Sequence, residues 1–550
     1  MKAMMLLVEV LLRKNNMKRV LIILLFPYSV FSQNMEFKFF ISFTDKNLSE
    51  YNLSEPEEFL SQESLFRREK QNIFVNKTDL PVCKTYVSAI RDKNFKILNR
   101  TKWLNGVIVS TNDSSLIENI DLSFVDSIIY FGKWEVINKE HNERGFSFHR
   151  KNNKGASLNQ IYMLWGDSLH DKGFKGEDMT IAVLDAGFYN VDSLDCFSHL
   201  FFDGRILGTY DFVEQEKEVY NDDTHGMSVL SCMGSDLQNG FMGTAPKANY
   251  YLLRTEDAYS ENVIEEYNWI CGAEFADSIG ADVINSSLGY TTFDYSIQNY
   301  TYDDLDGKTS PSTIAATMAS RKGIIVVNAA GNSGNGSWKY IGAPADADSI
   351  LTVGAVDENK EIASFSSYGP TSDGRVKPSV CAQGENTEVI NSQGNVINSN
   401  GTSFASPVLA GLVACLWQSH PTKSNIEIIN AVIQSATLYN NPNNNSGYGL
   451  ANFYKADSLL ILTEDLEPKL HLYPNPTDSK FTIELYSADN TFALISVYDI
   501  SSNLIYSSKE NLTRFDVNKI EIPKLDNKTI FVVVADLKNI SVKGKIVITE

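Results

Sequence analysis

The sequence predicts an α/β protein whose main domain is a mostly parallel sheet flanked by helices. Between residues 155 and 460, apolar runs of strand length alternate with helical segments, which is the pattern of parallel strands joined by crossover helices. After Glu464 the pattern changes to short alternating runs separated by turn residues, as in a small β-sandwich. The length allows roughly three or four domains, and a small α+β domain is predicted to come first.

The N-terminus has the composition of a secretory signal peptide, which we assign to residues 1–33. Lys18 and Arg19 precede a seven-residue apolar run, and the small Ser32 supplies a cleavage position. The apolar run is too short to span a membrane. No later stretch is long enough either, so we expect no transmembrane helix. Translation starting at Met17 rather than at the first residue would give the same signal.

Residues 34–137 form the predicted α+β domain. Within it, Phe37–Phe43 is predicted to be a strand. Pro56–Gln71 is predicted to be one amphipathic helix, with its acidic residues first and its basic residues last, as the helix dipole favours. Residues 138–155 are polar and net basic and contain Gly and Asn, which predicts an exposed linker. The main domain is assigned to residues 156–462.

Five apolar runs in the main domain are predicted strands, and several of them end in small or polar residues. Such endings are expected where a ligand lies beyond the carboxyl ends of parallel strands. Asp185, Ser287 and Asn332 each follow one of these runs, so a single cleft is able to collect them. The five runs are Thr180–Leu184, Tyr250–Leu253, Asp282–Asn285, Gly323–Asn328 and Ile350–Val353.

The composition excludes two classes of protein. With 43% hydrophobic and 11% aromatic residues, the chain buries large cores and is not intrinsically disordered. The formal charge of −20, from 68 acidic and 48 basic residues, argues against nucleic acid as a partner, because its binding needs clustered Lys and Arg. The six cysteines lack the spacing of a disulfide framework or a zinc site. Most are expected to be buried free thiols, Cys415 most clearly.

The stretch Gly401–Pro407 places Ser403 in a loop that runs straight into a helix rich in small residues. A serine hydroxyl becomes a nucleophile when a base takes its proton and amide donors hold the oxyanion. Asp185 ends an apolar run and His225 opens a helical stretch. Taken singly, each residue is better explained as a cap, a turn or a surface group. Together, in the chain order Asp, His, Ser, they predict a catalytic triad.

Two further segments are candidates for contacts to the reacting group and to the substrate. Asn332 lies beyond a predicted strand, where its side-chain amide is able to donate to an oxyanion. From the local sequence alone, Ala-Gly-Asn-Ser-Gly is better explained as a simple turn, because Asn and Gly tolerate left-handed backbone. Ser287, Leu288 and Gly289 are able to present a backbone edge to an extended peptide, although an ordinary strand end explains them equally well.

These blocks together resemble the subtilisin-like serine peptidases, or subtilases, over nearly all of the middle domain. The resemblance implies a subtilisin-like fold, the catalytic triad Asp185, His225 and Ser403, and Asn332 as the oxyanion residue. It also implies that Ser287, Leu288 and Gly289 line the non-primed subsites, and that Ala330 and Gly331 form the wall of the S1 pocket. The matching pieces are AVLDAG around Asp185, HGMSVLS from His225, GTAPKA from Gly243, NSSLG from Asn285, AAGNSG from Ala329, SSYGP from Ser366 and GTSFASP around Ser403.

Two departures from the family pattern leave the triad positions untouched, so activity is expected. The usual His-Gly-Thr-His block is here His225-Gly226-Met227-Ser228, and Phe404 replaces the commoner methionine after the nucleophile. The chemistry needs no cofactor. Many subtilases bind structural calcium, but the sequence assigns no ligands for it.

The two flanking domains also show resemblances. Residues 34–137 resemble a subtilase propeptide, which implies an intramolecular inhibitor, with the processing site in the linker at 138–155. Residues 468–550, which contain the motif LYPNP, resemble the C-terminal sorting domains of type IX secretion. This implies contact with the outer-membrane secretion machinery and a final location outside the cell or on its surface.

The sequence therefore predicts a secreted serine endopeptidase that is made as a zymogen and acts on proteins or peptides through an acyl-enzyme. Two alternatives stay open. One is a catalytically silent surface protein that uses the same scaffold to bind peptides. The other is a subtilase with restricted chemistry, such as an exopeptidase or a transpeptidase.

Overall fold

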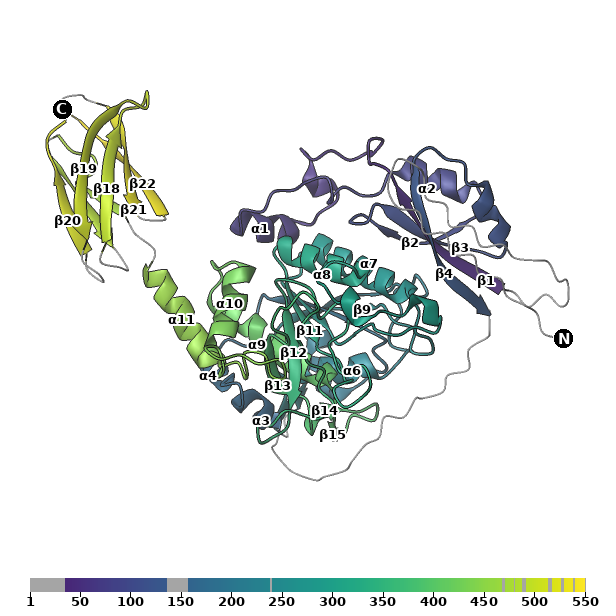
Figure 1. The fold of residues 1–550 in the computed structure, drawn as a ribbon. Coiled ribbons are helices and arrows are strands. Elements are labelled where there is room, and N and C mark those ends of the chain that lie inside the picture. Colours follow the sequence, from purple (N-terminus) through teal and green to yellow (C-terminus); the bar gives the residue numbers. More distant parts are fainter. Residues whose placement is uncertain are drawn as a thin grey trace, which may run out of the picture. The chain divides into compact units, whose positions relative to one another are not determined.

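The computed structural model describes residues 35–135, 157–237, 240–466 and 470–549, the last range with short gaps at 479, 487–490, 513–516, 526–528 and 538–539. The chain divides into two compact units, Met1–Ala456 and Asp457–Glu550. The predicted signal peptide and the predicted linker lie outside the described residues. The first unit contains an N-terminal domain and a larger α/β domain (Figure 1).

The N-terminal domain is a four-stranded antiparallel sheet in the order β2-β3-β1-β4. Phe39, Ile41 and Phe43 alternate along β1 and pack in the core of this domain, because every second side chain of a strand lies on the same face. The predicted strand at Phe37–Phe43 is confirmed. The elements are β1 (Met35–Phe43), α2 (Lys84–Arg91), β2 (Lys96–Thr101), β3 (Gly106–Thr111), the 3₁₀ helix η2 (Ser114–Asn119) and β4 (Val125–Glu135).

The predicted single helix over Pro56–Gln71 is wrong in its extent. The structure has a short 3₁₀ turn, η1 (Pro56–Glu58), followed by a break and then α1 (Gln62–Lys70). The break falls at Ser61, whose hydroxyl accepts a hydrogen bond from the backbone N–H of Ser64 at 3.1 Å. Because this serine satisfies an N–H that has no partner within the helix, the helix starts there and not at the proline.

The α/β domain is built on a seven-stranded sheet in the order β13-β12-β11-β10-β5-β9-β6, in which every neighbouring pair is parallel. The central strands are buried, as expected of a parallel sheet covered on both faces. All five predicted strands are confirmed, and two more extend the sheet. The strands are β5 (Thr180–Asp185), β6 (Ile206–Asp211), β9 (Asn249–Arg254), β10 (Val283–Ser286), β11 (Ile325–Ala329), β12 (Leu351–Val356) and β13 (Val380–Gln383).

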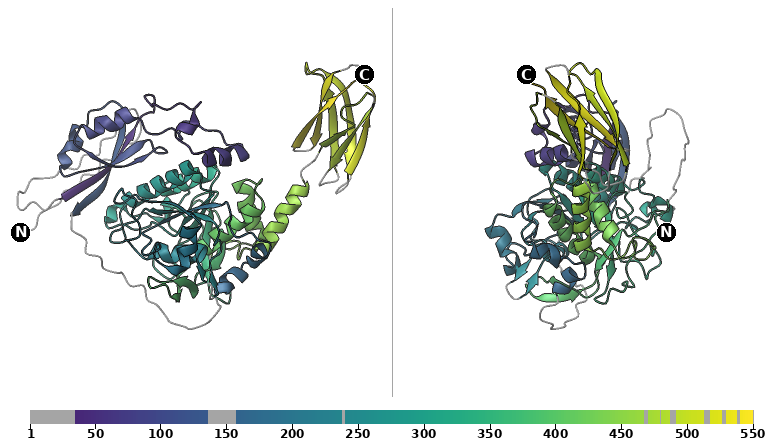
Figure 2. Two further views of the ribbon diagram at one scale, coloured as in Figure 1. Left: turned by 180° about the vertical axis from the view of Figure 1, so that it is seen from behind. Right: turned by 90° about the vertical axis from the view of Figure 1, so that its left-hand side faces the viewer.

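Helices cover both faces of this sheet (Figure 2). Successive residues of β5 face opposite layers. A Cβ placed on Gly272 of α7 would lie 3.1 Å from the Leu184 side chain, and one on Gly226 of α6 would lie 2.8 Å from Cβ of Asp185. Asp185 therefore faces the layer of α6 and α9, which pack against each other. The longer helices are α6 (His225–Gly234), α7 (Ile264–Ile279), α8 (Pro311–Arg321), α9 (Thr402–Ser419), α10 (Asn425–Ser435) and α11 (Phe453–Leu466).

Shorter elements complete the α/β domain. They are α3 (Ser157–Tyr162), α4 (Asp167–Asp171), η3 (Asp195–Phe197), α5 (Ser198–Phe202), β7 (Asp236–Leu237), β8 (Phe241–Met242), η4 (Ser296–Gln298), η5 (Tyr302–Asp304), β14 (Thr387–Ile390) and β15 (Val396–Ser399).

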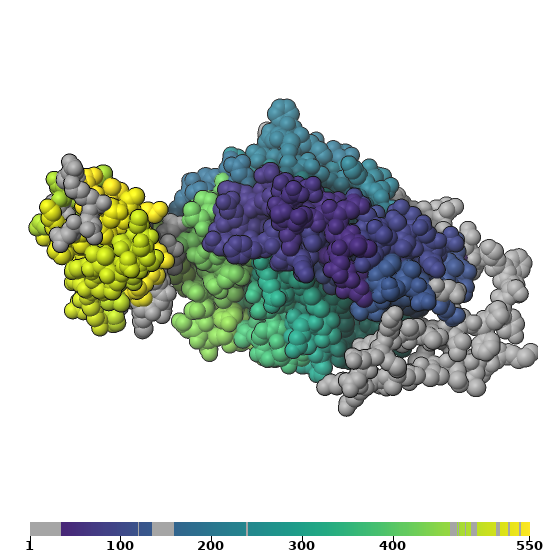
Figure 3. Space-filling view, turned by 90° about the horizontal axis from the view of Figure 1, so that it is seen from above, coloured from purple at the N-terminus to yellow at the C-terminus, as the bar shows by residue number. Residues whose placement is uncertain are grey.

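The N-terminal domain lies across the α/β domain (Figure 3), with α1 and β2 packed on α7. One buried carboxylate of α7, that of Asp277, pairs with three cations of the N-terminal domain. Its oxygens lie 2.7 Å from Arg67, 2.6 Å from Arg68 and 3.1 Å from Lys102. Burial alone would raise the pKa of Asp277, but the charges of these three residues outweigh it and lower the pKa below 3.8.

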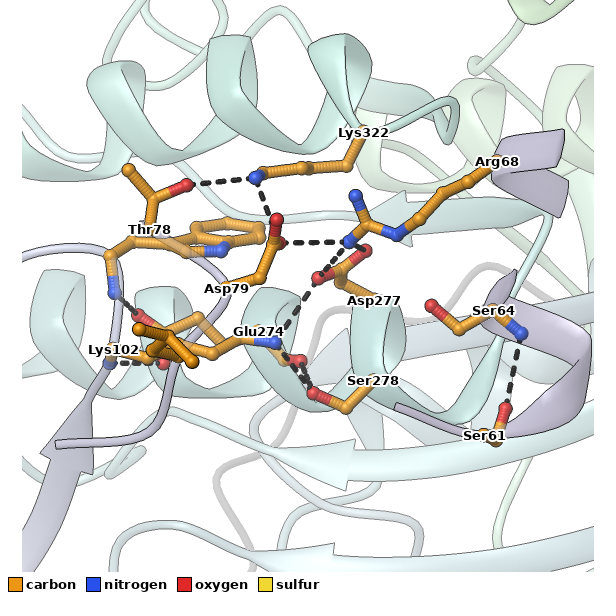
Figure 4. Close-up of polar contacts among 12 residues, drawn as sticks. Ser61, Ser64, Arg68, Thr78, Asp79, Lys102, Glu274, Asp277, Ser278 and Lys322 are labelled. Atoms are coloured by element: carbon orange, nitrogen blue, oxygen red, sulfur yellow. Dashed lines mark hydrogen bonds and ion pairs between the residues drawn. The ribbon is translucent and has the colours of Figure 1, made fainter. Parts of the chain in front are cut away.

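Further buried contacts join the two domains, as Figure 4 shows. Glu274 of α7 accepts a hydrogen bond from the backbone N–H of Trp103 at 2.8 Å. Asp79 of the N-terminal domain pairs with Arg68 at 3.0 Å and with Lys322 of the α/β domain at 2.8 Å. Since removing one partner from such a network leaves a buried charge uncompensated, these contacts bind the two domains into one unit.

The second unit contains a sandwich of two antiparallel sheets, β16-β17-β20 and β19-β18-β21-β22. Ile483, Ile495 and Val533 meet in the core between them. The predicted C-terminal β-sandwich is confirmed. Its strands are β16 (Leu470–Tyr473), β17 (Phe481–Tyr486), β18 (Thr491–Tyr498), β19 (Leu504–Leu512), β20 (Val517–Ile522), β21 (Ile530–Leu537) and β22 (Ile540–Val547).

All six cysteines are free and buried, which confirms the expectation of buried thiols. Cys415 lies in the interior of α9 and has no exposed surface. In the part of the chain that the structure describes, no helix combines the length and the hydropathy needed to cross a bilayer.

Candidate active site

The strand order of the parallel sheet reverses between β5 and β10. From β5, the chain first adds β6 and β9 on one side and then adds β10 to β13 in sequence on the other. At such a point two neighbouring loops leave the sheet in opposite directions and open a crevice beyond the carboxyl ends of the strands. Asp185 ends β5 and Ser287 follows β10, so two of the predicted residues lie at this crevice.

Asp185 and His225 form a direct hydrogen bond. His225 Nδ1 lies 2.7 Å from Asp185 Oδ1, and the Asp185 side chain is completely buried. The backbone N–H of Ala186 donates to the same oxygen at 2.8 Å, which fixes the carboxylate in place. Burial lowers the pKa of His225, but the charge and the hydrogen bond of Asp185 outweigh it, so the pKa is raised above 6.5.

The start of α6 positions the histidine. Oδ1 of Asp223 accepts a hydrogen bond from the backbone N–H of His225 at 2.7 Å. Gly226 follows, and a Cβ there would lie 2.3 Å from the carbonyl oxygen of Gly187. Because any larger side chain would collide with that backbone, glycine lets α6 approach β5 closely enough for the Asp185–His225 bond.

Ser403 is the second residue of α9, and it lies against the end of β10. Its Oγ donates to the carbonyl oxygen of Ser287 at 3.3 Å, while Oγ of Ser287 donates to the carbonyl oxygen of Ser403 at 2.8 Å. The ring of Phe404 lies 6.0 Å from that of His225, centroid to centroid. The N-terminus of α9 therefore meets both the histidine helix and the strand edge, at the positive end of the helix dipole.

The side chain of Asn332 is held in one orientation by Thr402. Oδ1 of Asn332 accepts from the backbone N–H of Thr402 at 2.9 Å and from its hydroxyl at 3.0 Å. The hydroxyl of Thr402 in turn accepts from the N–H of Gly331 at 3.1 Å. Because the oxygen is occupied in this way, the NH₂ group of Asn332 is the part of the amide that is left to donate. Gly331 has a φ of 106°, which a glycine adopts without strain.

A cavity of about 450 Å³ lies beside Ser403. Its size is that of a ligand pocket. Among the predicted site residues, those that line it are Ser287, Leu288, Gly289, Gly331, Asn332 and Ser403. Ala330, which was predicted to form part of the S1 wall, is not among the residues that line this cavity. That residue is completely buried and packs with apolar side chains such as Ile341 and Ala343, so Ala329 lines the cavity in its place.

The sequence motifs did not identify two groups of residues that lie at the site. Arg254 ends β9 and donates from Nε to the carbonyl oxygen of Ala186 at 3.1 Å. Two residues after it, Glu256 begins an acidic segment that lines the cavity. The predicted strand at Tyr250–Leu253 indicates where these residues lie, because polar residues that follow a parallel strand are at its carboxyl end.

No group of three or more His, Cys, Asp or Glu side chains is arranged to hold a metal ion among the described residues. Structural calcium therefore stays an expectation from the family resemblance, without assigned ligands.

The fold and the site define an α/β protein in which an aspartate–histidine pair and a serine at a helix N-terminus meet at the switch point of a parallel sheet. Three segments of the chain match known families. Residues 176–449 match the subtilase family, residues 38–145 match the peptidase S8 propeptide domain of Bacteroidota, and residues 471–549 match the secretion system C-terminal sorting domain.

Individual relatives are similar to about half of this chain. Subtilisin NAT from Bacillus subtilis subsp. natto is 34% identical over 286 residues, which are 51% of this chain and 66% of that protein. Subtilisin DY from Bacillus licheniformis is 31% identical over 279 residues, which are 50% of this chain and 90% of that protein. Among solved structures, MycP1 with its N-terminal propeptide removed has a TM-score of 0.44 at 23% identity and covers 54% of this chain and 96% of that one.

The chain belongs to the subtilase family of serine-type endopeptidases. The predicted resemblance is confirmed for all three segments: the peptidase, the propeptide and the sorting domain. The sorting domain indicates export by type IX secretion, so that the protein is secreted or lies at the cell surface.

Proposed function

We propose that this chain hydrolyses peptide bonds in proteins through Asp185, His225 and Ser403, by way of an acyl-enzyme. The observation that carries the proposal is the 2.7 Å hydrogen bond between His225 Nδ1 and Asp185 Oδ1, made where α6 packs against α9. A buried carboxylate on Nδ1 fixes the tautomer in which Nε2 carries the lone pair that accepts a proton. Nε2 is then the base for the Ser403 hydroxyl.

In the acylation step, Ser403 Oγ attacks the carbonyl carbon of the scissile bond while its proton passes to His225 Nε2. The carbonyl oxygen becomes negatively charged and accepts hydrogen bonds from Nδ2 of Asn332 and from the backbone N–H of Ser403, which has no partner within the first turn of the helix. His225 then gives its proton to the leaving nitrogen, the C–N bond breaks and the amine product departs. Asp185 stabilises the imidazolium in between.

In the deacylation step, water attacks the acyl carbon and gives a proton to His225. The bond between Ser403 Oγ and the acyl carbon breaks, the proton returns to Oγ, and the acid product leaves. Donors that are already fixed in place before the reaction require no reorganisation when the charge forms. The two hydrogen bonds from Thr402 to Asn332 Oδ1 provide this fixed geometry.

The substrate is proposed to bind as an extended strand along Ser287, Leu288 and Gly289. These residues follow β10 and line the cavity next to Ser403. An added strand gains main-chain hydrogen bonds that do not depend on its sequence, which suits an endopeptidase acting on unfolded segments of proteins.

The N-terminal domain is proposed to act as an intramolecular inhibitor until the linker is cut. Its support is the buried network around Asp277 and the propeptide family match at residues 38–145. We propose the following boundaries for the precursor. They are a signal peptide at 1–33, a propeptide at 34–137, a linker with the processing site at 138–155, a peptidase domain at 156–462 and a sorting domain at 468–550.

The test is to label the purified secreted protein with a fluorophosphonate probe, which reacts with an activated serine. The wild type should be labelled and should lose its N-terminal segment, and Ser403→Ala should do neither. Ser419→Ala, at the other end of the same helix, is the matched control and should behave as the wild type. Correctly folded, propeptide-free protein that takes no label would favour the peptide-binding scaffold instead.

A further inference from the structure

The cavity beside Ser403 has a strongly acidic wall that the proposed mechanism does not use. Among the described residues, five carboxylate residues line the cavity and no Lys, Arg or His residue does. Four of them come from the segment after β9 and the start of α7, and the fifth comes from the loop after β10. They are Glu256, Asp257, Glu261, Glu265 and Asp294.

Two of these carboxylates are buried, and neither has a neighbouring cation in the part of the chain that the structure describes. Glu256 is 8% exposed and Glu265 is 2% exposed. Oε1 of Glu256 accepts hydrogen bonds from Tyr290 at 2.6 Å and from Thr255 at 3.0 Å. Its Oε2 has no hydrogen-bond or ion-pair partner among the described residues. A buried carboxylate is costly unless it is paired, so this oxygen is a vacant acceptor at the cavity.

The cost of burial is reflected in the acidity of both groups. Burial, together with the charge of Glu261, raises the pKa of Glu256 to about 8. Burial and the neighbouring carboxylates, Glu256 foremost, raise the pKa of Glu265 well above 4.5. A cation placed between the two carboxylates would remove this penalty, because an opposite charge within a few ångströms favours the ionised form.

The geometry favours a cationic side chain of the substrate over a metal ion. The described residues contain no group of three or more His, Cys, Asp or Glu arranged to hold a metal. The acidic wall instead belongs to the same cavity as Ser403 and Asn332, which a bound peptide must enter. Lys and Arg carry their charge on a long apolar stem, and the guanidinium fork of Arg offers donors to more than one carboxylate.

The processing linker of this chain has the complementary charge. Residues 138–155 contain five Lys or Arg residues and two Glu residues. A protease that is released by cutting its own linker meets this basic segment as its first substrate. Charge complementarity between cleft and substrate raises the rate of encounter and suppresses wrong partners.

Building on the proposed peptidase activity, we infer that this protease selects substrates with Lys or Arg on the acyl side of the scissile bond. Glu256 and Glu265 in the depth of the wall and Glu261 at its exposed rim are the specificity-determining residues. They bind the cation of the substrate and take no part in bond breaking.

The test uses the processed, secreted protein and tetrapeptides that carry a fluorogenic leaving group. Each peptide has Arg, Lys, norleucine or Glu at one of its four positions. Glu265→Gln and Glu261→Gln each replace an ionisable carboxyl group by a neutral amide of the same shape, and Glu361→Gln, at an exposed position outside the cavity, is the matched control. Labelling by a fluorophosphonate gives the number of active sites, by which kcat/KM is divided.

The expected result is that Arg or Lys exceeds norleucine at one position by roughly 10- to 100-fold in kcat/KM, as hydrogen bonds between charged groups produce. Both cavity variants should reduce that ratio, and the control should keep it. Labelled enzyme that cleaves neutral peptides equally well, or variants that keep the full preference, would overturn the inference but leave the peptidase function intact. Protein that takes no label and cleaves no peptide would refute the peptidase function and the inference together. Glu261 is exposed, so its variant remains informative if the buried one fails to fold.

Discussion

The guanidinium of Arg254 donates to the carbonyl oxygen of Ala186, the residue that follows Asp185, at 3.1 Å. The same guanidinium pairs with Asp211 at 2.6 Å and with Asp222 at 3.3 Å. Asp222 lies three residues before His225. One buried cation therefore ties together the two loops that carry the aspartate and the histidine of the proposed triad.

Replacing Arg254 by Met is expected to lower both stability and activity. The change keeps an unbranched apolar stem but leaves the carboxylate of Asp211 buried without its cation, which costs about 3–5 kcal/mol in the free energy of unfolding. Denaturant unfolding in a Ser403→Ala background measures this without self-digestion, and kcat in the active background should fall as well. Arg321→Met, at the exposed end of α8, should change neither. An unchanged kcat would show that the two loops hold their positions without Arg254.

Asp185→Asn is expected to reduce kcat by about 10⁴-fold, because an amide stabilises the wrong tautomer of the histidine. The change also has a pH signature. His225 must be neutral to act as a base, and its pKa is raised above 6.5 chiefly by Asp185 acting against burial. Activity should therefore rise with pH through a value above 6.5 in the wild type, and through a lower value in the variant. The profile of kcat/KM against pH measures the pH at which activity rises in each protein. If that pH is the same in the variant and in the wild type, the assigned role of Asp185 is contradicted.

Asn332→Ala is expected to lower kcat by about 10²–10³-fold with little change in KM, the loss known for one oxyanion-hole donor in subtilisin. The reason is that the amide is proposed to donate only to charge that develops in the transition state. Steady-state kinetics on one peptide substrate separate the two parameters. Asn359→Ala, at an exposed position, is a control for loss of an asparagine. A rise in KM at unchanged kcat would instead assign Asn332 to ground-state binding.

Asp277→Asn is expected to weaken the contact between the propeptide and the peptidase. Arg67, Arg68 and Lys102 would lose their common anion, which costs about 3–5 kcal/mol. Because the pKa of Asp277 is lowered in the folded state, its contribution is present above pH 3.8 and is lost as the pH falls through the folded-state value. Denaturant unfolding of the Ser403→Ala precursor measures the loss, with Glu69→Gln on the exposed face of α1 as the control.

The preference for basic substrates is expected to increase with pH. Glu256, with its pKa raised to about 8, is protonated and neutral in the free enzyme below that value and charged above it. The ratio of kcat/KM for an Arg peptide to that for a norleucine peptide should therefore rise between about pH 6 and 9. Taking the ratio cancels the titration of His225, which affects both peptides alike. A ratio that is flat with pH would remove Glu256 from the selectivity.

The parallel sheet and the residues at its switch point could be predicted from the sequence, because the ends of strands and the starts of helices are marked by local residue patterns. Apolar runs located β5 and β10, and the polar residue after each run pointed to the crevice. The interruption of the helix at Ser61 was missed, since the amphipathic pattern continues through it and only the capping bond reveals the break. Ala330 was predicted to form part of a pocket wall. In the structure it is buried against a distant segment, and the local sequence does not indicate that contact.

Contacts between segments far apart in the chain were also beyond prediction. Nothing local in α7 indicates that Asp277 meets three cations from another domain. Likewise, the acidic residues after β9 have the composition of a solvated loop. Only the fold shows that Glu256 is buried and that it shares a cavity with Ser403.

The six cysteines of this exported protein are all free and buried. Its thiols are shielded within the core, and burial raises the pKa of Cys232 and Cys381 to values at which almost no reactive thiolate is present at neutral pH. Neither an oxidising nor a reducing medium therefore has a cross-link to make or break. The fold therefore depends on no disulfide, and its thiols are shielded from oxidants in the solvent.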